Sequence, residues 1–196
     1  SNPRIGVQPH SLKDFIRVVC GSEGGDNATL SDQVNVLGNH FGSYDFKLEY
    51  TMPNWKLAAY HQHYFEDKSG MIFVNGTDGL WGAQLDLPRL PWLKKVVTEY
   101  QGPGGGGDDY YNNIEYITGS SYFGQGIGSP LLTSPQYNTN GDIDFKNTRV
   151  RAWHLAFEGD LSPMVSYRLR YTLMNSWGKP YAPFLDNKRS NSGQVE

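Results

Sequence analysis

Two segments in the last third of the chain alternate between apolar and polar residues. In residues 151–161 the odd positions carry Trp153, Leu155, Phe157 and Leu161, and His154, Glu158 and Asp160 lie between them. In residues 165–173 the odd positions are Val, Tyr, Leu, Tyr and Leu, and the even ones include Arg168, Arg170 and Thr172. This period of two predicts β-strands with one apolar and one polar face. The short connection 161–163 joins them into a hairpin.

The same pattern occurs earlier in the chain. Tyr44, Phe46, Leu48 and Tyr50 alternate with polar residues, and a turn at 52–54 leads into a run that begins at Trp55. A third pair covers 80–87 and 92–100, with a turn at 88–91. Residues 12–20 are a further candidate strand, although their alternation is poor. We therefore expect about seven strands, mostly about 9 to 11 residues long.

Strand length and connection length favour a transmembrane barrel over a soluble sandwich. Soluble strands average about 5 to 6 residues, whereas a tilted strand needs about 9 to 11 to cross a bilayer. Short turns alternate with long connections, at about 66–79 and 101–148, and outer-membrane barrels place such long loops outside the cell. The fold class that we predict is all-β: an antiparallel up-and-down transmembrane β-barrel, with residues 1–196 as part of one barrel domain.

This fold assigns an environment to each face of the last hairpin. The apolar residues of 153–157 and 167–173 are expected to face lipid. The lumen-facing candidates are His154, Glu158, Arg168 and Arg170. Tyrosines and tryptophans near strand ends, among them Tyr44, Tyr50, Trp55, Trp92 and Tyr100, are typical of the aromatic girdles at membrane interfaces.

Composition narrows the function classes. A net charge of −3 provides no basic stripe for nucleic acid. The mean hydropathy of −0.56 does not exclude a membrane barrel, because its strands alternate polar and apolar residues. The single cysteine, Cys20, lies in an apolar run and is expected to be a packed hydrophobe rather than a catalytic thiol. The start of the chain has no signal-peptide pattern, and SGQVE at its end resembles the beginning of another strand, so we expect both ends to be cuts.

One cluster resembles a metal site. His61 and His63 point to the same face of a strand, and Glu66 and Asp67 follow. Because no third ligand occurs at a fixed spacing, a polar lumen or rim is the favoured interpretation. We expect no metal, no cofactor and no catalytic residue.

Residues 109–113 are the candidate sugar-binding residues: Asp109, Tyr110, Tyr111, Asn112 and Asn113. Carboxylates and amides hydrogen-bond to sugar hydroxyls, and aromatic rings pack on the C–H faces of sugars. The alternative is that these residues form turns and pack the loop. The preceding QGPGGGGDD, residues 101–109, is either a flexible linker or a join across missing residues.

Several stretches taken together resemble a known family. They are GNHFGSYDF (38–46), WKLAAYHQHYFEDKSGM (55–71), DGLWGAQLDL (78–87), DDYYNN (108–113) and FGQGIGSPLLTSP (123–135). This ordered set, spread over nearly the whole chain, resembles the Wzi-type capsule assembly proteins in the form found in Bacteroides-like bacteria. The resemblance implies an outer-membrane barrel of about 18 strands, of which this chain is a fragment. The remaining strands would come from the rest of the polypeptide or from other chains.

The function implied by the resemblance is non-catalytic and lectin-like. It is the attachment of capsular polysaccharide to the bacterial surface, with outer-membrane lipid as the second partner. Two alternatives stay open. One is an outer-membrane porin or transporter, and the other is a soluble β-sandwich carbohydrate-binding module.

Overall fold

The computed structural model describes residues 7–66, 68–74, 76, 78–102, 109, 111–127, 129–133, 135–137, 139 and 143–196. Seven strands form the main sheet: β1 (Gly42–Met52), β2 (Trp55–Phe65), β3 (Gly79–Asp86), β4 (Lys95–Gly102), β9 (Val150–Ser162), β10 (Val165–Lys179) and β11 (Ala182–Val195). The helices are α1 (Leu12–Cys20), α2 (Leu30–Val34) and α3 (Lys68–Met71). Two small hairpins pair β5 (Ser121–Tyr122) with β6 (Gln125–Gly126), and β7 (Gln136–Tyr137) with β8 (Ile143–Asp144).

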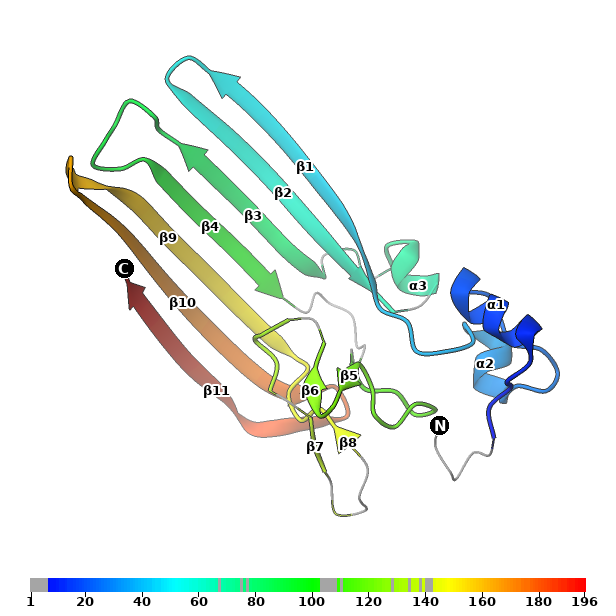
Figure 1. The fold of residues 1–196 in the computed structure, drawn as a ribbon. Helices are drawn as coiled ribbons and strands as arrows, with labels where there is room; N and C mark the ends of the chain where they lie inside the picture. Colours follow the sequence, from blue (N-terminus) through cyan, green and yellow to red (C-terminus); the bar gives the residue numbers. More distant parts are fainter. Residues whose placement is uncertain are drawn as a thin grey trace.

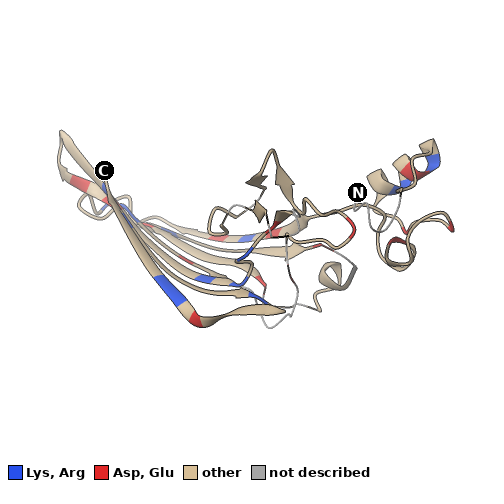
Figure 2. Cartoon of the chain, turned by 90° about the horizontal axis from the view of Figure 1, so that it is seen from below, with Lys and Arg blue, Asp and Glu red and all other residues tan. Residues whose placement is uncertain are grey.

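The main sheet is antiparallel throughout and follows the order of the chain, β1-β2-β3-β4-β9-β10-β11. The all-β, antiparallel, up-and-down part of the prediction is confirmed. In the described residues the sheet is open, with β1 and β11 as its edges. It is strongly curved across its strands (Figure 2).

The connections divide between the two ends of the sheet (Figure 1). One end, the turn end, carries the links β1–β2, β3–β4 and β9–β10. The other end, the loop end, carries the connections 66–78 and 103–149 together with the helices and the small hairpins. The link between β10 and β11 is also at the loop end, although it is only residues 180–181. The chain leaves β11 at the turn end.

The predicted strand pairs are present with small shifts. Met52 pairs with Trp55 across a two-residue turn, and β9 and β10 form the predicted hairpin. The strand predicted from Trp92 begins only at Lys95, because residues 87–94 form hydrogen-bonded turns. The prediction for SGQVE was wrong in detail, since residues 192–195 are the end of β11 and do not start a new strand.

Residues 12–20 are a helix and not a strand, so that prediction was wrong. Ser11 caps α1: its side chain accepts a hydrogen bond from the backbone N–H of Asp14, and the Asp14 carboxylate accepts one from the backbone of Ser11. Gly21 ends the helix in the left-handed conformation. Cys20 is exposed, which corrects its prediction as a packed hydrophobe. Its helix turns several apolar side chains to solvent, and Leu12, Phe15 and Val19 are all exposed.

Strand register places most apolar side chains on one face, here called the apolar face. Its middle row is Tyr50, Leu57, Leu85, Val96, Phe157, Leu169 and Val195. The row nearer the loop end is Leu48, Ala59, Ala83, Thr98, Leu155, Tyr171 and Gly193. The next is an aromatic row: Phe46, His61, Trp81, Tyr100 and Trp153, followed by Leu173 and Asn191.

Except at the loop end of β1 and β2, where Phe73 packs on it, the apolar face is not covered by other described elements. Trp153 is 56% exposed and Leu48 75%, and Leu155, Leu169, Tyr171 and Leu173 are also exposed. Among the described helices only α3 contacts the sheet. Among the described residues, the buried apolar side chains in the main sheet are the small ones of Ala58, Val150 and Ala152, and a separate cluster lies in the connections at the loop end, where Tyr111 packs with Phe145 and Leu132. The sheet therefore has no conventional core on this face.

Candidate functional site: the polar face of the sheet

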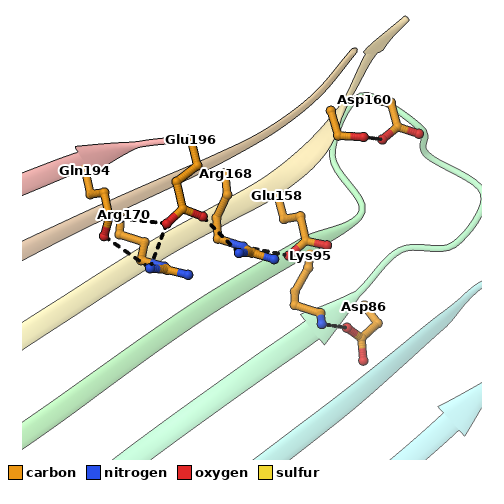
Figure 3. Close-up of polar contacts among 9 residues, drawn as sticks. Asp86, Lys95, Glu158, Asp160, Arg168, Arg170, Gln194 and Glu196 are labelled. Carbon is orange, nitrogen blue, oxygen red and sulfur yellow. Dashed lines mark hydrogen bonds and ion pairs between the residues drawn. The ribbon is translucent and has the colours of Figure 1, made fainter. Parts of the chain in front are cut away.

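Charged residues of alternating sign cross the opposite face, here called the polar face. Register aligns Lys56 with Asp86, Asp86 with Lys95, Lys95 with Glu158, and Glu158 with Arg168. Arg168 exchanges two backbone hydrogen bonds with Glu196, which continues the row past the end of β11. Figure 3 shows the side chains from Asp86 to Glu196 gathered along this line. We call these six residues the charge row.

Ion pairs connect much of the charge row (Figure 3). Nε of Arg168 lies 3.3 Å from Oε2 of Glu158, and Nη1 of Arg168 lies 3.0 Å from Oε2 of Glu196. Nζ of Lys95 lies 3.9 Å from Oδ1 of Asp86. At the β1 edge, Nζ of Lys56 lies 2.8 Å from Oε1 of Glu49. Charged side chains on one strand are thus paired with side chains of opposite charge on the next strand. Such pairs on facing residues stabilise a sheet.

A second set of polar contacts lies nearer the loop end. The Tyr60 hydroxyl donates a hydrogen bond of 2.5 Å to Oε1 of Glu99 on β4. To do so the ring lies over Gly82 of the intervening strand, where an added Cβ would be 2.1 Å from Tyr60 Cε2. His154 Nδ1 lies 2.8 Å from the Thr172 hydroxyl. Arg170 Nη1 donates to Gln194 Oε1 at 3.1 Å and to Glu196 Oε1 at 3.3 Å.

A hollow of about 340 Å³ lies on the polar face between β4, β9 and β10. All four predicted lumen-facing residues, His154, Glu158, Arg168 and Arg170, line it. Lys95, Glu99 and Thr172 also line the hollow, and the first two were missed. Lys95 and Glu99 could have been predicted to share a face, because they are four residues apart on one strand and every second residue of a strand lies on the same face.

The hollow presents both donors and acceptors of hydrogen bonds to a polar ligand. Its cationic side chains donate hydrogen bonds, its carboxylates accept them, and Thr172 can do both. Arg168 and Arg170 remain exposed despite their ion pairs, which leaves further N–H groups free to meet a ligand. Hydroxyl and carboxylate groups are the ligand chemistry that such a surface accommodates.

The predicted sugar-binding residues 109–113 are engaged within the loop end wherever the structure describes them. Asp109 accepts hydrogen bonds from the Thr148 hydroxyl at 2.6 Å and from Asn112 Nδ2 at 3.2 Å. The Asn112 side chain also pairs with both backbone groups of Phe145, at 2.8 and 3.0 Å. These contacts tie together the two ends of the connection 103–149. Tyr110 lies outside the described residues.

Tyr111 and Asn113 have similar structural contacts. The Tyr111 ring is 6% exposed, has φ 75°, and lies 5.7 Å from the Phe145 ring between centroids. Burial raises the pKa of its hydroxyl, which accepts a hydrogen bond from the backbone N–H of Ser129. Asn113 accepts hydrogen bonds from two backbone N–H groups at 115 and 116, and it donates to Asn39 Oδ1 at 3.1 Å. Sugar binding by these residues remains a prediction.

A small cavity of about 30 Å³ lies where the polar face meets the loop end. Its lining includes Tyr64, Asp78, Gln101, Tyr111 and Thr148. This volume holds about one water molecule. It is too small for a sugar ring.

His61 and His63 occupy different environments on the apolar face. The His61 ring stacks on Trp81 with centroids 3.7 Å apart, whereas His63 is fully buried and its Nε2 donates to the carbonyl oxygen of Gly70 at 2.9 Å. Their ring centroids are 6.0 Å apart. In the described part of the chain, no group of three or more His, Cys, Asp or Glu side chains is arranged to hold a metal ion. Asp67 lies outside that part.

At the loop end, Asp144 of β8 connects a small hairpin to the main sheet. Its carboxylate oxygens lie 2.7 and 2.8 Å from Nζ of Lys179, the last residue of β10, and 2.9 Å from Nζ of Lys146. Burial opposes ionisation of Asp144, but the bonds from the two lysines outweigh it and lower the pKa. Asp32 of α2 behaves in the opposite way: burial raises its pKa, although Tyr116 donates a hydrogen bond to it.

Comparisons with known proteins give no further assignment. No family model, no curated protein and no solved structure matches the chain. Among the described residues, no helix combines the length and the apolar character that a bilayer crossing requires.

Proposed function

We propose that the chain is part of a bacterial outer-membrane β-barrel and attaches capsular polysaccharide to the cell surface without catalysing a reaction. The observation that carries the membrane part is the uncovered apolar face. Its middle row is apolar on all seven strands, from Tyr50 to Val195. An exposed apolar surface of this extent is unfavourable in water and favourable against lipid chains.

The polar face supports the same proposal because it fits a lumen. A barrel that contains this sheet would enclose the charge row, where opposite charges are already paired across strands. The aromatic row, with Trp81, Tyr100 and Trp153, lies between the aliphatic rows and the loop end, as expected for an interfacial girdle. Lipid satisfies no backbone hydrogen bonds, so the open edges at β1 and β11 require further strands. In this proposal the strands come from the rest of the polypeptide or from other chains.

The ligand class rests on the family resemblance, and two places are candidates for it. One is the loop predicted from residues 109–113, whose described members bond within the protein, and the other is the hollow on the polar face. Contacts between a sugar chain and single side chains are each worth on the order of 1 kcal/mol. Firm retention would then come from many repeats of the polymer that bind many copies of the protein.

The proposal is tested by measuring how much capsular polysaccharide stays with the cells and how much enters the medium. Tyr110→Ala is expected to release capsule if the loop binds the polymer, and Arg170→Gln if the hollow does. The matched control is Arg89→Gln, an exposed position in the turn between β3 and β4. Each variant must be present in the outer membrane at the wild-type level.

The outcomes separate the two sites from failure of the proposal. Release by Arg170→Gln alone would move the site from the loop to the polar face, and release by Arg89→Gln would mean a nonspecific effect. If both Tyr110→Ala and Arg170→Gln retain capsule at the wild-type level, polysaccharide attachment through these sites is wrong.

A porin or transporter is the second candidate, and the water-accessible hollow on the polar face favours it. Measurement of conductance in planar bilayers distinguishes this candidate, because a solute pathway conducts ions. The third candidate, a soluble carbohydrate-binding module, predicts partition into the aqueous phase without detergent. The uncovered apolar face argues against that result.

A further inference from the structure

The end of α3 and the residues that follow it, 71–74, fold over the apolar face at the loop end. The Phe73 ring lies with its centroid 4.4 Å from that of His63, 5.6 Å from that of Tyr44 and 6.3 Å from that of Phe46. All three partners belong to the apolar face, since Tyr44 pairs with His63 and Phe46 with His61. The loop therefore turns to the side of the aromatic row and not to the polar face.

Backbone geometry holds Phe73 in this place. Phe73 has φ 62°, a left-handed conformation that glycine usually adopts at the end of a helix. Its N–H donates to the Gly70 carbonyl at 2.9 Å, and the Val74 N–H donates to the Ser69 carbonyl at 3.1 Å. His63 Nε2 donates to the same Gly70 carbonyl. The segment cannot move away without uncovering the His63 ring and breaking this bond.

The side chains that flank Phe73 point away from the protein. Ile72 and Val74 are each 67% exposed, and Met71 is also exposed. This cluster of apolar side chains adjoins the aromatic row, because the Phe73 ring packs on Phe46. A fixed loop with aliphatic residues outward and an aromatic ring inward has the character of an interfacial membrane anchor.

We propose that residues 71–74 are a lipid anchor, with Ile72 and Val74 inserted at the boundary between lipid headgroups and acyl chains. The inference rests on the proposed membrane location, because the apolar face with which the segment is continuous must itself meet lipid. Lipid is the occupant because the segment extends a surface that spans all strands of the sheet. A protein partner would need an interface that is distinct from the apolar face of the sheet.

Site-directed spin labelling tests the proposal, on the protein purified from outer membranes together with the strands that complete its barrel and reconstituted in phosphatidylcholine vesicles. The single cysteine is exposed, so Cys20→Ser provides the background. Single labels are placed at Ile72→Cys and Val74→Cys, at Leu155→Cys on the apolar face, and at Phe123→Cys. Phe123 is the matched control because it is an apolar residue 88% exposed at the same end of the sheet, in the turn between β5 and β6. Collision with apolar oxygen and with a water-soluble nickel chelate measures the depth of each label.

The expected order of depth is Leu155, then the labels at 72 and 74, then Phe123 in water. The anchor is refuted if the labels at 72 and 74 match the aqueous Phe123 label while Leu155 lies in lipid. If the Leu155 label is itself exposed to the nickel chelate, the membrane proposal fails. Spin–spin broadening at 72 that disappears on dilution with unlabelled protein would instead assign the segment to contacts between copies, which also overturns the anchor.

Discussion

At Gly82 the absence of a side chain decides how three strands fit together. The Tyr60 ring lies over this glycine, and its hydroxyl reaches Glu99 on the far side of β3. Any Cβ at position 82 would occupy the space of the ring. Crowding of this kind typically costs about 1 to 3 kcal/mol, because the ring must move and its hydrogen bond is lost.

Gly82→Ala is therefore expected to lower the free energy of unfolding by about 1 to 3 kcal/mol. In a Tyr60→Ala background the same change should cost little, so a double-mutant cycle should give a coupling energy of about 1 kcal/mol or more. Urea unfolding in lipid vesicles provides the measurement. The control is Gly193→Ala on β11, where the nearest atom would be 3.7 Å from the new Cβ. Equal costs at Gly82 with and without the Tyr60 ring would contradict the explanation.

Contacts of this type, between single residues on different strands, could mostly not be predicted from the sequence. The alternation correctly predicted that His154, Glu158, Arg168 and Arg170 share one face. Successive side chains of a strand point to opposite faces, so the face of each residue follows from its position in its own strand. The role of Gly82 depends on the register between β2 and β3. The alternation along a single strand gives no information about that register. Asn112 was predicted to meet a sugar, yet its amide pairs with the backbone of Phe145, a residue far along the chain.

At the scale of elements, the middle of the β9–β10 hairpin places its large apolar side chains on one face and its charged side chains on the other. Leu169 lies in the middle apolar row between Phe157 and Val195, whereas Thr172 lies on the polar face beside His154. Leu169→Arg should destabilise the protein by about 2 to 4 kcal/mol if this row lies near the bilayer midplane. Thr172→Ser keeps the hydroxyl and should be nearly neutral.

Unfolding in lipid vesicles measures both changes, and unfolding in detergent micelles is a useful comparison. A similar tolerance for the two substitutions would remove the distinction between a lipid face and a lumen face. Leu169→Met, which conserves volume and apolar character, is the control for disturbed packing and should cost less than about 1.5 kcal/mol.

The β7–β8 hairpin depends on an ionised carboxylate for its attachment to β10. Asp144→Asn should cost about 1.5 to 3 kcal/mol at neutral pH, because it removes charge-assisted bonds to Lys179 and Lys146. The folded-state pKa of Asp144 is lowered. Its stabilising effect is therefore fully present above the unfolded value near 3.8 and is lost as the pH falls through the lower folded value.

The measurement is the difference in unfolding free energy between wild type and Asp144→Asn as a function of pH. That difference should be constant near neutral pH and should decrease only in acid. A difference that grows as the pH falls would have the wrong sign and would refute the assignment. Lys146→Met should reproduce only part of the loss, since Lys179 makes the two shorter contacts.

Prediction of elements from the sequence succeeded for six strands of the main sheet and failed for β11 and the first helix. The six strands contain enough alternation to be recognised, whereas β11, with the sequence APFLDNKRSNSGQV, has few apolar residues and no regular alternation. The segment LKDFIRVVC has apolar residues at positions 12, 15, 16 and 19, which is the spacing of an amphipathic helix, so its assignment to a strand misread the pattern. Its boundaries were further signals, with Ser11 three residues before Asp14 and Gly21 after the last turn.

At the scale of the whole molecule, β1 and β11 run in the same direction, toward the turn end (Figure 1). A closed antiparallel cylinder that contains this sheet therefore needs an odd number of further strands between these two edges. The direction of the edges could not be predicted from the sequence pattern, because residues 12–20 were assigned to a strand and β11 was not recognised as one. The packing of the loop end was not predictable either, since Gln8 meets Glu115, and Asn39 meets Asn113, across long separations.

The charge row has a consequence for how accurately strands align during assembly. A slip of two residues between neighbouring strands keeps every apolar side chain on its own face, so alternation alone does not oppose it. Slipping β3 by two residues against β2 would place Lys56 opposite Gln84 or Pro88 instead of Asp86. The same slip against β4 would leave Lys95 opposite the same two residues. The lysines of β2 and β4 thus select one alignment of β3 among several that burial of apolar groups would accept equally.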